Sequence, residues 1–230
     1  LGMTKVTPIF CETPQTPFAP TWGYYIAEKD LDIDVKSLSS IILKEEQIIK
    51  GKYPDYWADA SQDELDACGA VGLGKDCLTS RFNHFNVLKW DYPVCKKLHE
   101  KIREFHKEFI DNAFKSNGKH PELKVRCWAN VMRKGQLINK HCHAHHEYCY
   151  LSGNFVVQSY DTTTNYYHPF NNDVYTSENI DGRMTMFPSW VVHDSTTHLL
   201  DTPRITVGFD ILISNPDNSE NTKEHNLVPL

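Results

Sequence analysis

The stretch PRITVGFDILI, residues 203–213, alternates between two kinds of side chain. The apolar set is Ile205, Val207, Phe209 and Ile211. The other set is Arg204, Thr206, Gly208 and Asp210. Because successive side chains of a strand point to opposite faces, this pattern predicts a buried strand with one apolar and one polar face. Arg204 and Thr206 lie two apart on the polar face, and a guanidinium beside a hydroxyl can bind a carboxylate.

The segments around this stretch also have the short period of β-strands. Upstream, GRMTMFPSWVVH (residues 182–193) follows the turn dipeptide Asp181-Gly182 and ends at His193, eleven positions before Arg204. Predicted strands are Val125–Met132, His141–Gln158, Arg183–Val192 and Arg204–Ser214. Between them, Asp161–Asn179 is expected to be a long polar loop with one short strand near Asn165–His168. This loop is either a lid over a site or a plain hairpin connection.

The first half of the chain is expected to be mainly helical. Residues 93–115 have apolar side chains at three- and four-residue steps, and Val35–Ile49 is a second predicted helix. The prediction is therefore an α+β fold in one domain, with helices packed on a β sandwich or barrel. Residues 3–124 form a helical and mixed support region, residues 125–214 form the β core with the site, and residues 215–230 form a polar tail.

Composition narrows the function. The chain has 230 residues, 40% of them hydrophobic, and a formal net charge of −6, which argues against binding to nucleic acid through its phosphates. It has no apolar run long enough to predict a membrane span. Seven cysteines without framework spacing favour reduced thiols in a cytoplasm. Leu1 and Gly2 precede Met3, which we expect to be the native start.

The stretch HCHAHHEYCYLSGN, residues 141–154, is a candidate metal site. On a strand, His141, His143, His145 and Glu147 would share one face. Neighbours on that face are ~6.7 Å apart and can hold one ion between them, whereas positions four apart are roughly 13 Å apart and cannot. One neighbouring pair is therefore expected to bind: His141/His143, His143/His145 or His145/Glu147.

Two other interpretations of this stretch exist. A histidine-rich surface turn needs no metal at all. A structural zinc site would use Cys142 or Cys149, but these cysteines do not have the short Cys-x-x-Cys spacing typical of closed zinc sites.

The order of motifs resembles the iron(II)- and 2-oxoglutarate-dependent oxygenases, and most of all a group of 2-oxoglutarate/iron oxygenases common in bacteria and marine phages. The resemblance covers about residues 125 to 213. The matching residues are Trp128, Asn130, Gly135, His141-Cys142-His143, Ser152-Gly153-Asn154, Phe187-Pro188-Ser189-Trp190, His193 and Arg204-Ile205-Thr206. The Phe-Pro-Ser-Trp, His and Arg-x-Thr elements are the most specific of these.

The resemblance implies a double-stranded β-helix, which is a jelly-roll or cupin-like barrel of two antiparallel sheets. It also implies iron(II) bound by three protein ligands, with open positions for 2-oxoglutarate and O₂. Arg204 and Thr206 would bind the distal carboxylate of the keto acid, with Asn130 as a further cofactor-binding residue. The implied reaction is hydroxylation with release of succinate and CO₂.

The resemblance leaves open which pair on the histidine strand binds the metal. Counting forward from Gly135 selects His141/His143, which with His193 makes a three-histidine set that is also the catalytic centre. Counting back from Ser152-Gly153 selects His145/Glu147, which restores the carboxylate of the usual two-histidine triad. About three extra residues between the two motifs create this conflict. We predict His141, His143 and His193 as ligands, with His145/Glu147 as the alternative pair.

Two other functions remain open. One is a cupin-like metal protein, either an isomerase or a dioxygenase that uses no keto acid and so does not need Arg204. The other is a non-catalytic barrel that binds a ligand or partner. If the chain is an oxygenase, its partners are O₂ and a small-molecule or peptide substrate that the sequence does not identify. A cytoplasmic location, in a host cell if phage-encoded, is expected.

Overall fold

The computed structural model describes residues 2–54, 72–113, 121–144, 147–214 and 226–230. The strands are β1 (Lys5–Ile9), β2 (Tyr24–Asp30), β3 (Leu123–Met132), β4 (Cys149–Gln158), β5 (Thr163–Tyr167), β6 (Val174–Glu178), β7 (Arg183–Pro188), β8 (His193–Ser195), β9 (Arg204–Ile213) and β10 (Val228–Pro229). The helices are α1 (Val35–Lys52), α3 (Pro93–Ala113) and two short 3₁₀ helices, η1 (Thr79–His84) and η2 (Val87–Lys89).

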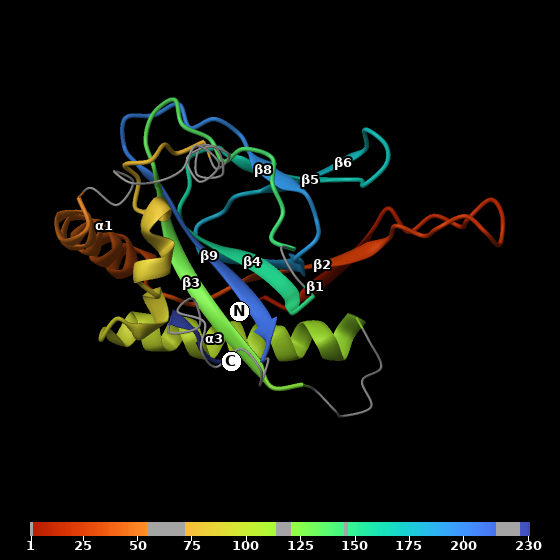
Figure 1. Cartoon of the computed structure of the whole chain (residues 1–230), viewed down its shortest axis with the longest axis horizontal. Helices are drawn as coiled ribbons and strands as arrows, with labels where there is room; N and C mark the ends of the chain where they lie inside the picture. The colour runs from red at the N-terminus through yellow and green to blue at the C-terminus, as the bar shows by residue number, and fades with distance from the viewer. Residues whose placement is uncertain (1, 55–71, 114–120, 145–146, 215–225) are drawn as a thin grey trace.

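The strands form two antiparallel sheets that face each other. The large sheet has the order β1-β2-β7-β4-β9-β3-β10, and the small sheet has the order β6-β5-β8 (Figure 1). Ile26 of the large sheet and Tyr166 of the small sheet belong to one buried apolar cluster, so the two sheets pack face to face. This arrangement confirms the predicted double-stranded β-helix.

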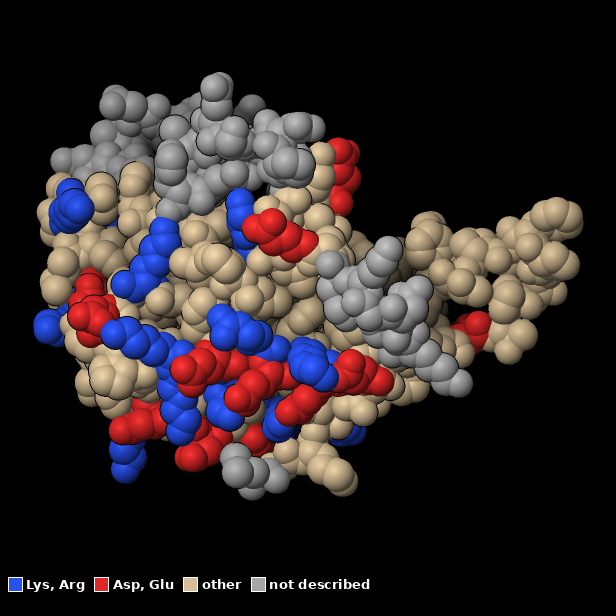
Figure 2. All heavy atoms as spheres, turned by 90° about the horizontal axis from the view of Figure 1, so that it is seen from below, with Lys and Arg blue, Asp and Glu red and all other residues tan. Residues whose placement is uncertain are grey.

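The two long helices cover the outer face of the large sheet. One hydrophobic core joins α1 and α3 to the inner strands β3, β4, β7 and β9. The apolar period of α3 predicted this packing, because residues such as Leu98, Ile102 and Phe105 recur on one buried face. Its opposite face carries Lys and Arg interleaved with Asp and Glu (Figure 2). Ion pairs there include Lys101–Glu104 and Lys107–Asp111.

Alternation along β9 separates the core from the barrel interior. Ile205, Val207, Phe209 and Ile211 belong to the core shared with the helices. The intervening side chains turn into the space between the sheets, where Thr206 contacts Asn130 and Asp210 contacts His143. The polar face expected from the sequence therefore lines the inside of the barrel.

The Ser152-Gly153 motif lies at the centre of the large sheet, where β4 pairs with both β7 and β9. A Cβ atom added to Gly153 would lie 2.3 Å from Cζ of Phe209 and 2.4 Å from the carbonyl oxygen of Thr185. Neither neighbour is free to move, since both lie in the packed centre of the sheet. Glycine is therefore required here by close approach.

We expect Gly153→Ala to lower the free energy of unfolding by about 1–3 kcal/mol, because it overpacks the core. For a chain of this size, each kcal/mol corresponds to about 2–4 °C in Tm. Thermal unfolding followed by circular dichroism would measure the change. Gly51→Ala in α1 is the matched control, because nothing lies within 4 Å of its added Cβ. An unchanged Tm in Gly153→Ala would contradict the close packing at this position.

The predicted strand His141–Gln158 was wrong in its first half. β4 begins at Cys149, and residues 145–146 lie outside the described part of the chain. The backbone N–H of His141 donates to the carbonyl of His193, and that of His143 donates to the carbonyl of Ser189. This segment therefore pairs with β8 and the turn before it, and it does not extend the β4–β9 pairing.

The segment Asp161–Asn179 was predicted as a long loop with one short strand near Asn165–His168, serving either as a lid or as a hairpin connection. The structure shows the hairpin: β5 and β6 pair within the small sheet. β5 also pairs with β8, so that Tyr166 lies opposite His193. The sequence did not predict the full strand pair, because threonines and asparagines occupy some of its inward positions, which are therefore not uniformly apolar. The hairpin forms a wall of the barrel.

Both chain ends join the large sheet. β1 and β2 pair with each other, and β2 continues onto β7, so the first half of the chain contributes strands as well as helices. Most of the expected polar tail, residues 215–225, lies outside the described residues. Beyond it, β10 pairs with β3. Among the described residues, none of the helices combines the length and the apolar character needed to cross a membrane.

Candidate metal centre

Three histidines from two chain segments meet between the sheets. His193 is the first residue of β8, and a backbone bridge holds it against His141. One ring nitrogen from each of His141, His143 and His193 lies within 4.8 Å of the other two. Two nitrogens bound to one ion at roughly 2.1 Å are at most about 4.2 Å apart, so a small contraction would allow all three to bind the same ion.

Hydrogen bonds determine which nitrogen each ring offers. Nδ1 of His141 lies 2.7 Å from the carbonyl oxygen of Asn139, and Nδ1 of His193 lies 2.9 Å from that of Val191. Nδ1 of His143 lies 2.8 Å from Oδ1 of Asp210. A carbonyl or a carboxylate oxygen only accepts, so each Nδ1 donates, and in a neutral ring this leaves the lone pair on Nε2. This is the arrangement that metal-binding histidines usually have.

Burial keeps His193 in the form that binds metal. Burial, together with the neighbouring His141 and His143, lowers the pKa of His193 well below its usual value. Its imidazole is therefore neutral at pH 7, as a ligand must be. Phe187 and Tyr166 flank its ring, with ring centroids 4.8 and 6.1 Å away.

Asp210 is a site residue that the sequence analysis did not identify. It is 3% exposed, and Oδ1 accepts from Ser152 Oγ at 2.8 Å as well as from His143. Oδ2 accepts from Nε and an NH₂ group of Arg126 at 3.1 and 2.8 Å. Burial alone would raise the pKa of Asp210, but His143 and Arg126 hold it well below its usual range. The available signal was its place on the Arg204–Thr206 face of the strand.

The ring of Trp128 packs against the centre from the β3 side. It stacks on His143 with a centroid distance of 5.6 Å, and it covers the backbone of Gly208. A Cβ atom at Gly208 would lie 2.7 Å from the indole ring, so only glycine leaves space for this contact. Trp128 and Gly208 therefore help to fix the orientation of the His143 ring.

Arg204 is a buried cation that pairs with no carboxylate of the described residues. It is 2% exposed, its Nε has no hydrogen-bond partner, and an NH group contacts Sδ of Met132 at 3.5 Å. Within the described part of the chain, no carboxylate pairs with it. Burial lowers the pKa of Arg204 to about 10, so it remains charged at neutral pH. Because burying an unpaired charge is costly, this geometry indicates a site for an anionic ligand.

Thr206 and Asn130 lie beside Arg204 on paired strands. Asn130 is opposite Thr206 in the β3–β9 register, and its Nδ2 donates to Thr206 Oγ1 at 3.2 Å. Oδ1 of Asn130 accepts from Thr79 of η1 at 2.7 Å. Since Thr206 accepts in this network, its own hydroxyl proton is available to a ligand. Thr79 is a further residue that the sequence analysis missed.

The other predicted candidates that the structure describes are not part of the histidine cluster. Glu147 is exposed in a turn, and His145 lies outside the described residues. Cys142 and Cys149 are half-buried and lie outside the cluster. Among the described residues, the one group of potential ligands close enough to share an ion is therefore the three histidines.

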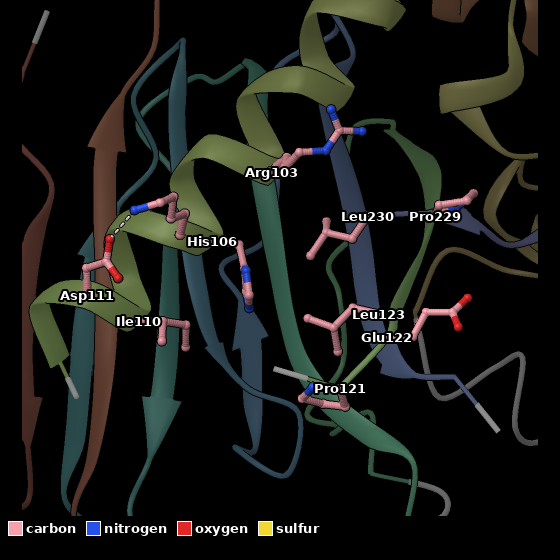
Figure 3. A pocket seen from close by; sticks show the side chains of 10 residues that line it. Arg103, His106, Ile110, Asp111, Pro121, Glu122, Leu123, Pro229 and Leu230 are labelled. Atoms are coloured by element: carbon pink, nitrogen blue, oxygen red, sulfur yellow. Dashed lines mark hydrogen bonds and ion pairs between the residues drawn. The ribbon is translucent and has the colours of Figure 1, made fainter. Parts of the chain in front are cut away.

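A separate hollow of about 470 Å³ lies between α3, the start of β3 and the last residues of the chain (Figure 3). It is lined by apolar side chains, such as Ile110 and Leu230, and by charges of both signs, including the Lys107–Asp111 ion pair. None of the three clustered histidines lines it. It does not belong to the metal centre.

The solved structures described next align with this chain at low sequence identity. No family model matches the chain, and no curated protein matches its sequence. A prolyl-4-hydroxylase from Pseudomonas putida aligns at 10% identity and a TM-score of 0.43, covering 54% of this chain and 68% of its own. A 2OG-Fe(II) oxygenase family oxidoreductase from Burkholderia pseudomallei aligns at 17% identity and 0.43, covering 55% and 61%. AviO1 from Streptomyces viridochromogenes aligns at 13% identity and 0.44, covering 57% and 65%.

Each of these alignments spans little more than half of the chain, and in the second and third the chain covers less than two thirds of the other protein. The class of this protein is therefore defined by its own fold and site. It is a double-stranded β-helix with a candidate three-histidine metal centre.

Proposed function

We propose that the protein is an iron(II)- and 2-oxoglutarate-dependent oxygenase. The observation that carries this proposal is the pairing of two features inside one barrel. Three histidines can present nitrogen ligands to one ion. The buried cation Arg204 lies on the same interior face of β9 as Asp210, which contacts His143. A metal-bound keto acid whose far carboxylate meets Arg204 would use both features.

The donor set fits iron(II). Imidazoles are ligands that suit iron, and three of them on one face leave positions for a chelating keto acid and O₂. When bound, iron with 2-oxoglutarate and O₂ supplies the oxidising power for attack on a C–H bond. The protein orients the ligands and keeps the site dry.

Each site residue has a defined part in this proposal. His141, His143 and His193 hold the metal. Arg204 pairs with the distal carboxylate of 2-oxoglutarate, and Thr206 donates its hydroxyl proton to the same group. Asn130 accepts from Thr79 and donates to Thr206, so it holds that hydroxyl in the orientation that faces the ligand.

We further propose hydroxylation as the reaction. The substrate R–H, 2-oxoglutarate and O₂ are converted to R–OH, succinate and CO₂. One oxygen atom enters the alcohol and the other enters succinate. The substrate class remains a small molecule or a peptide. The described cysteines form no disulfide with one another, which supports a reducing compartment such as the cytoplasm of a bacterium or of a phage-infected host.

A second function has one specific observation in its favour. The usual triad of keto-acid oxygenases contains a carboxylate, and the cluster here contains none. A dioxygenase or isomerase that uses no keto acid would need only the three histidines. Arg204 would then have no role in catalysis. The two functions differ in whether 2-oxoglutarate binds.

We expect a weak visible charge-transfer band when iron(II) and 2-oxoglutarate are added together without oxygen. The band requires the 1-carboxylate and 2-oxo group to chelate the metal, so succinate should not produce it. Anaerobic absorption spectroscopy is the measurement, and slow succinate formation in air is a second readout. A folded sample that binds iron(II) but shows no band at saturating keto acid would favour the second function.

A further inference from the structure

We propose that Asp210 is the positioning residue of the metal centre, which holds His143 and supplies the negative charge that the three-histidine set lacks. This inference rests on the proposed function only in requiring that the histidines bind a metal. Asp210 does not join the group of potential ligands, so it acts through His143.

Hydrogen bonds to both oxygens of the Asp210 side chain hold its carboxylate in one orientation. Oδ1 accepts from His143 and from Ser152, and Oδ2 accepts twice from Arg126. The Ser152 hydroxyl also lies 2.9 Å from that of Ser189, whose carbonyl accepts from the His143 backbone. Strands β3, β4 and β9 and the turn after β7 therefore all contribute to the orientation of a single imidazole. Such support around a metal-binding histidine raises its basicity and fixes its ring.

The charge of Asp210 is only partly offset by Arg126. The side chain of Asp210 is 4% exposed, whereas that of Arg126 is 24% exposed. Water screens the more exposed charge better, so the guanidinium contributes less to the potential inside the barrel than the buried carboxylate does. The net effect at the histidines is negative, which favours a bound cation.

A purely structural ion pair would behave differently. If Arg126 and Asp210 only stabilised the sheet, losing either one would affect metal binding in the same direction. If Asp210 provides charge to the centre, losing Arg126 leaves that charge less compensated. Loss of each partner should then have opposite effects on the metal.

The test measures the affinity of the full-length protein for Mn(II), with the metal alone as the probe. We expect Asp210→Asn to weaken binding ten- to a hundredfold, the range usual for residues that support a metal-bound histidine. The amide retains an acceptor for His143 but loses the charge. Arg126→Gln should bind Mn(II) as tightly as the wild type or more tightly. Ser152→Ala removes one donor to Oδ1 but retains the carboxylate and the His143 contact, so it should weaken binding less than Asp210→Asn does.

The matched control is Asp194→Asn. Asp194 follows His193 in the chain, but it bonds Asn165 and Tyr167 and none of the three histidines, so its loss removes a nearby charge without touching a ligand. Its Mn(II) affinity should remain close to wild type. The Fe(III)/Fe(II) potential gives a second readout, which Asp210→Asn should raise and Arg126→Gln should lower.

The outcomes separate this inference from the proposed function. Weaker binding in both Asp210→Asn and Arg126→Gln, or wild-type binding in Asp210→Asn, overturns the positioning role alone. If Asp210→Asn does not fold, weaker binding in Arg126→Gln overturns it. If the wild-type protein binds no Mn(II) or iron(II), both proposals fall. Metal binding with the expected variant effects but no keto-acid band overturns only the oxygenase function.

Discussion

Alanine at His141, His143 or His193 should each lower iron(II) affinity by on the order of a hundredfold or more. A four-ligand zinc site contributes about 10–16 kcal/mol, which amounts to several kcal/mol for each ligand. One ring nitrogen of each histidine lies within 4.8 Å of the other two, so each of the three is expected to be a ligand. Metal content after gel filtration and titration with Mn(II) would measure the loss.

The controls for this experiment are His145→Ala and Glu147→Ala. They should retain the metal, because Glu147 is exposed and apart from the cluster. The opposite pattern, with loss of metal in these two variants and retention in His141→Ala and His143→Ala, would establish the alternative pair. Circular dichroism of each metal-free variant checks that a lost ion does not reflect a lost fold.

The elements predicted best from the sequence are those whose signal is local. The helix at Pro93–Ala113 shows its apolar face in its own residues, and β9 shows its two faces by simple alternation. Both patterns come from burial on one side of a regular element, so a short window contains them. The α+β class could be predicted because helical signals in the first half of the chain are followed by strand signals in the second half.

The elements predicted poorly are those that depend on distant partners. The histidine segment does not extend β4, because the backbone of His141 forms its hydrogen bonds with that of His193, far along the chain. The β5–β6 hairpin was predicted only as one short strand near Asn165–His168 and as an open alternative, because its residues are polar: Thr164 donates to Asn179 inside the barrel and needs no apolar face. Short windows of sequence contain neither contact.

The candidate site shows the same division. Arg204 and Thr206 could be chosen because they lie two apart on one strand face. Asp210 shares that face, but its importance comes from His143, Ser152 and Arg126, which the fold brings to it from other strands. The role of a carboxylate in such a network depends on tertiary contacts, so the sequence suggests its face and not its partners.

Arg204→Met should weaken 2-oxoglutarate binding roughly ten- to a hundredfold while leaving iron(II) binding unchanged, and it should raise the Tm of the ligand-free protein. A charge-assisted hydrogen bond between a guanidinium and a carboxylate contributes about 1.5–3 kcal/mol, or roughly ten- to a hundredfold in affinity. Met removes that interaction and the hydrogen bonds with it. Without ligand, however, Arg204 is a buried cation lacking an anionic partner among the described residues. Replacing it by an apolar side chain of similar length therefore removes a desolvation cost.

Thermal unfolding with and without 2-oxoglutarate, in the presence of Mn(II), measures both effects at once. A ligand at a hundred times its Kd stabilises the wild-type protein by about 2.7 kcal/mol, and at the same concentration this gain should fall to about 0.4–1.4 kcal/mol in Arg204→Met. Arg204→Lys should recover only part of it, because lysine lacks the planar fork that pairs with both carboxylate oxygens. Arg183→Ala is the control, since Arg183 also begins a strand of the large sheet but pairs with Asp30 away from the site. A ligand-induced gain that persists undiminished in Arg204→Met would show that the keto acid does not use this guanidinium. A lower Tm in the ligand-free variant would show that Arg204 stabilises the fold itself.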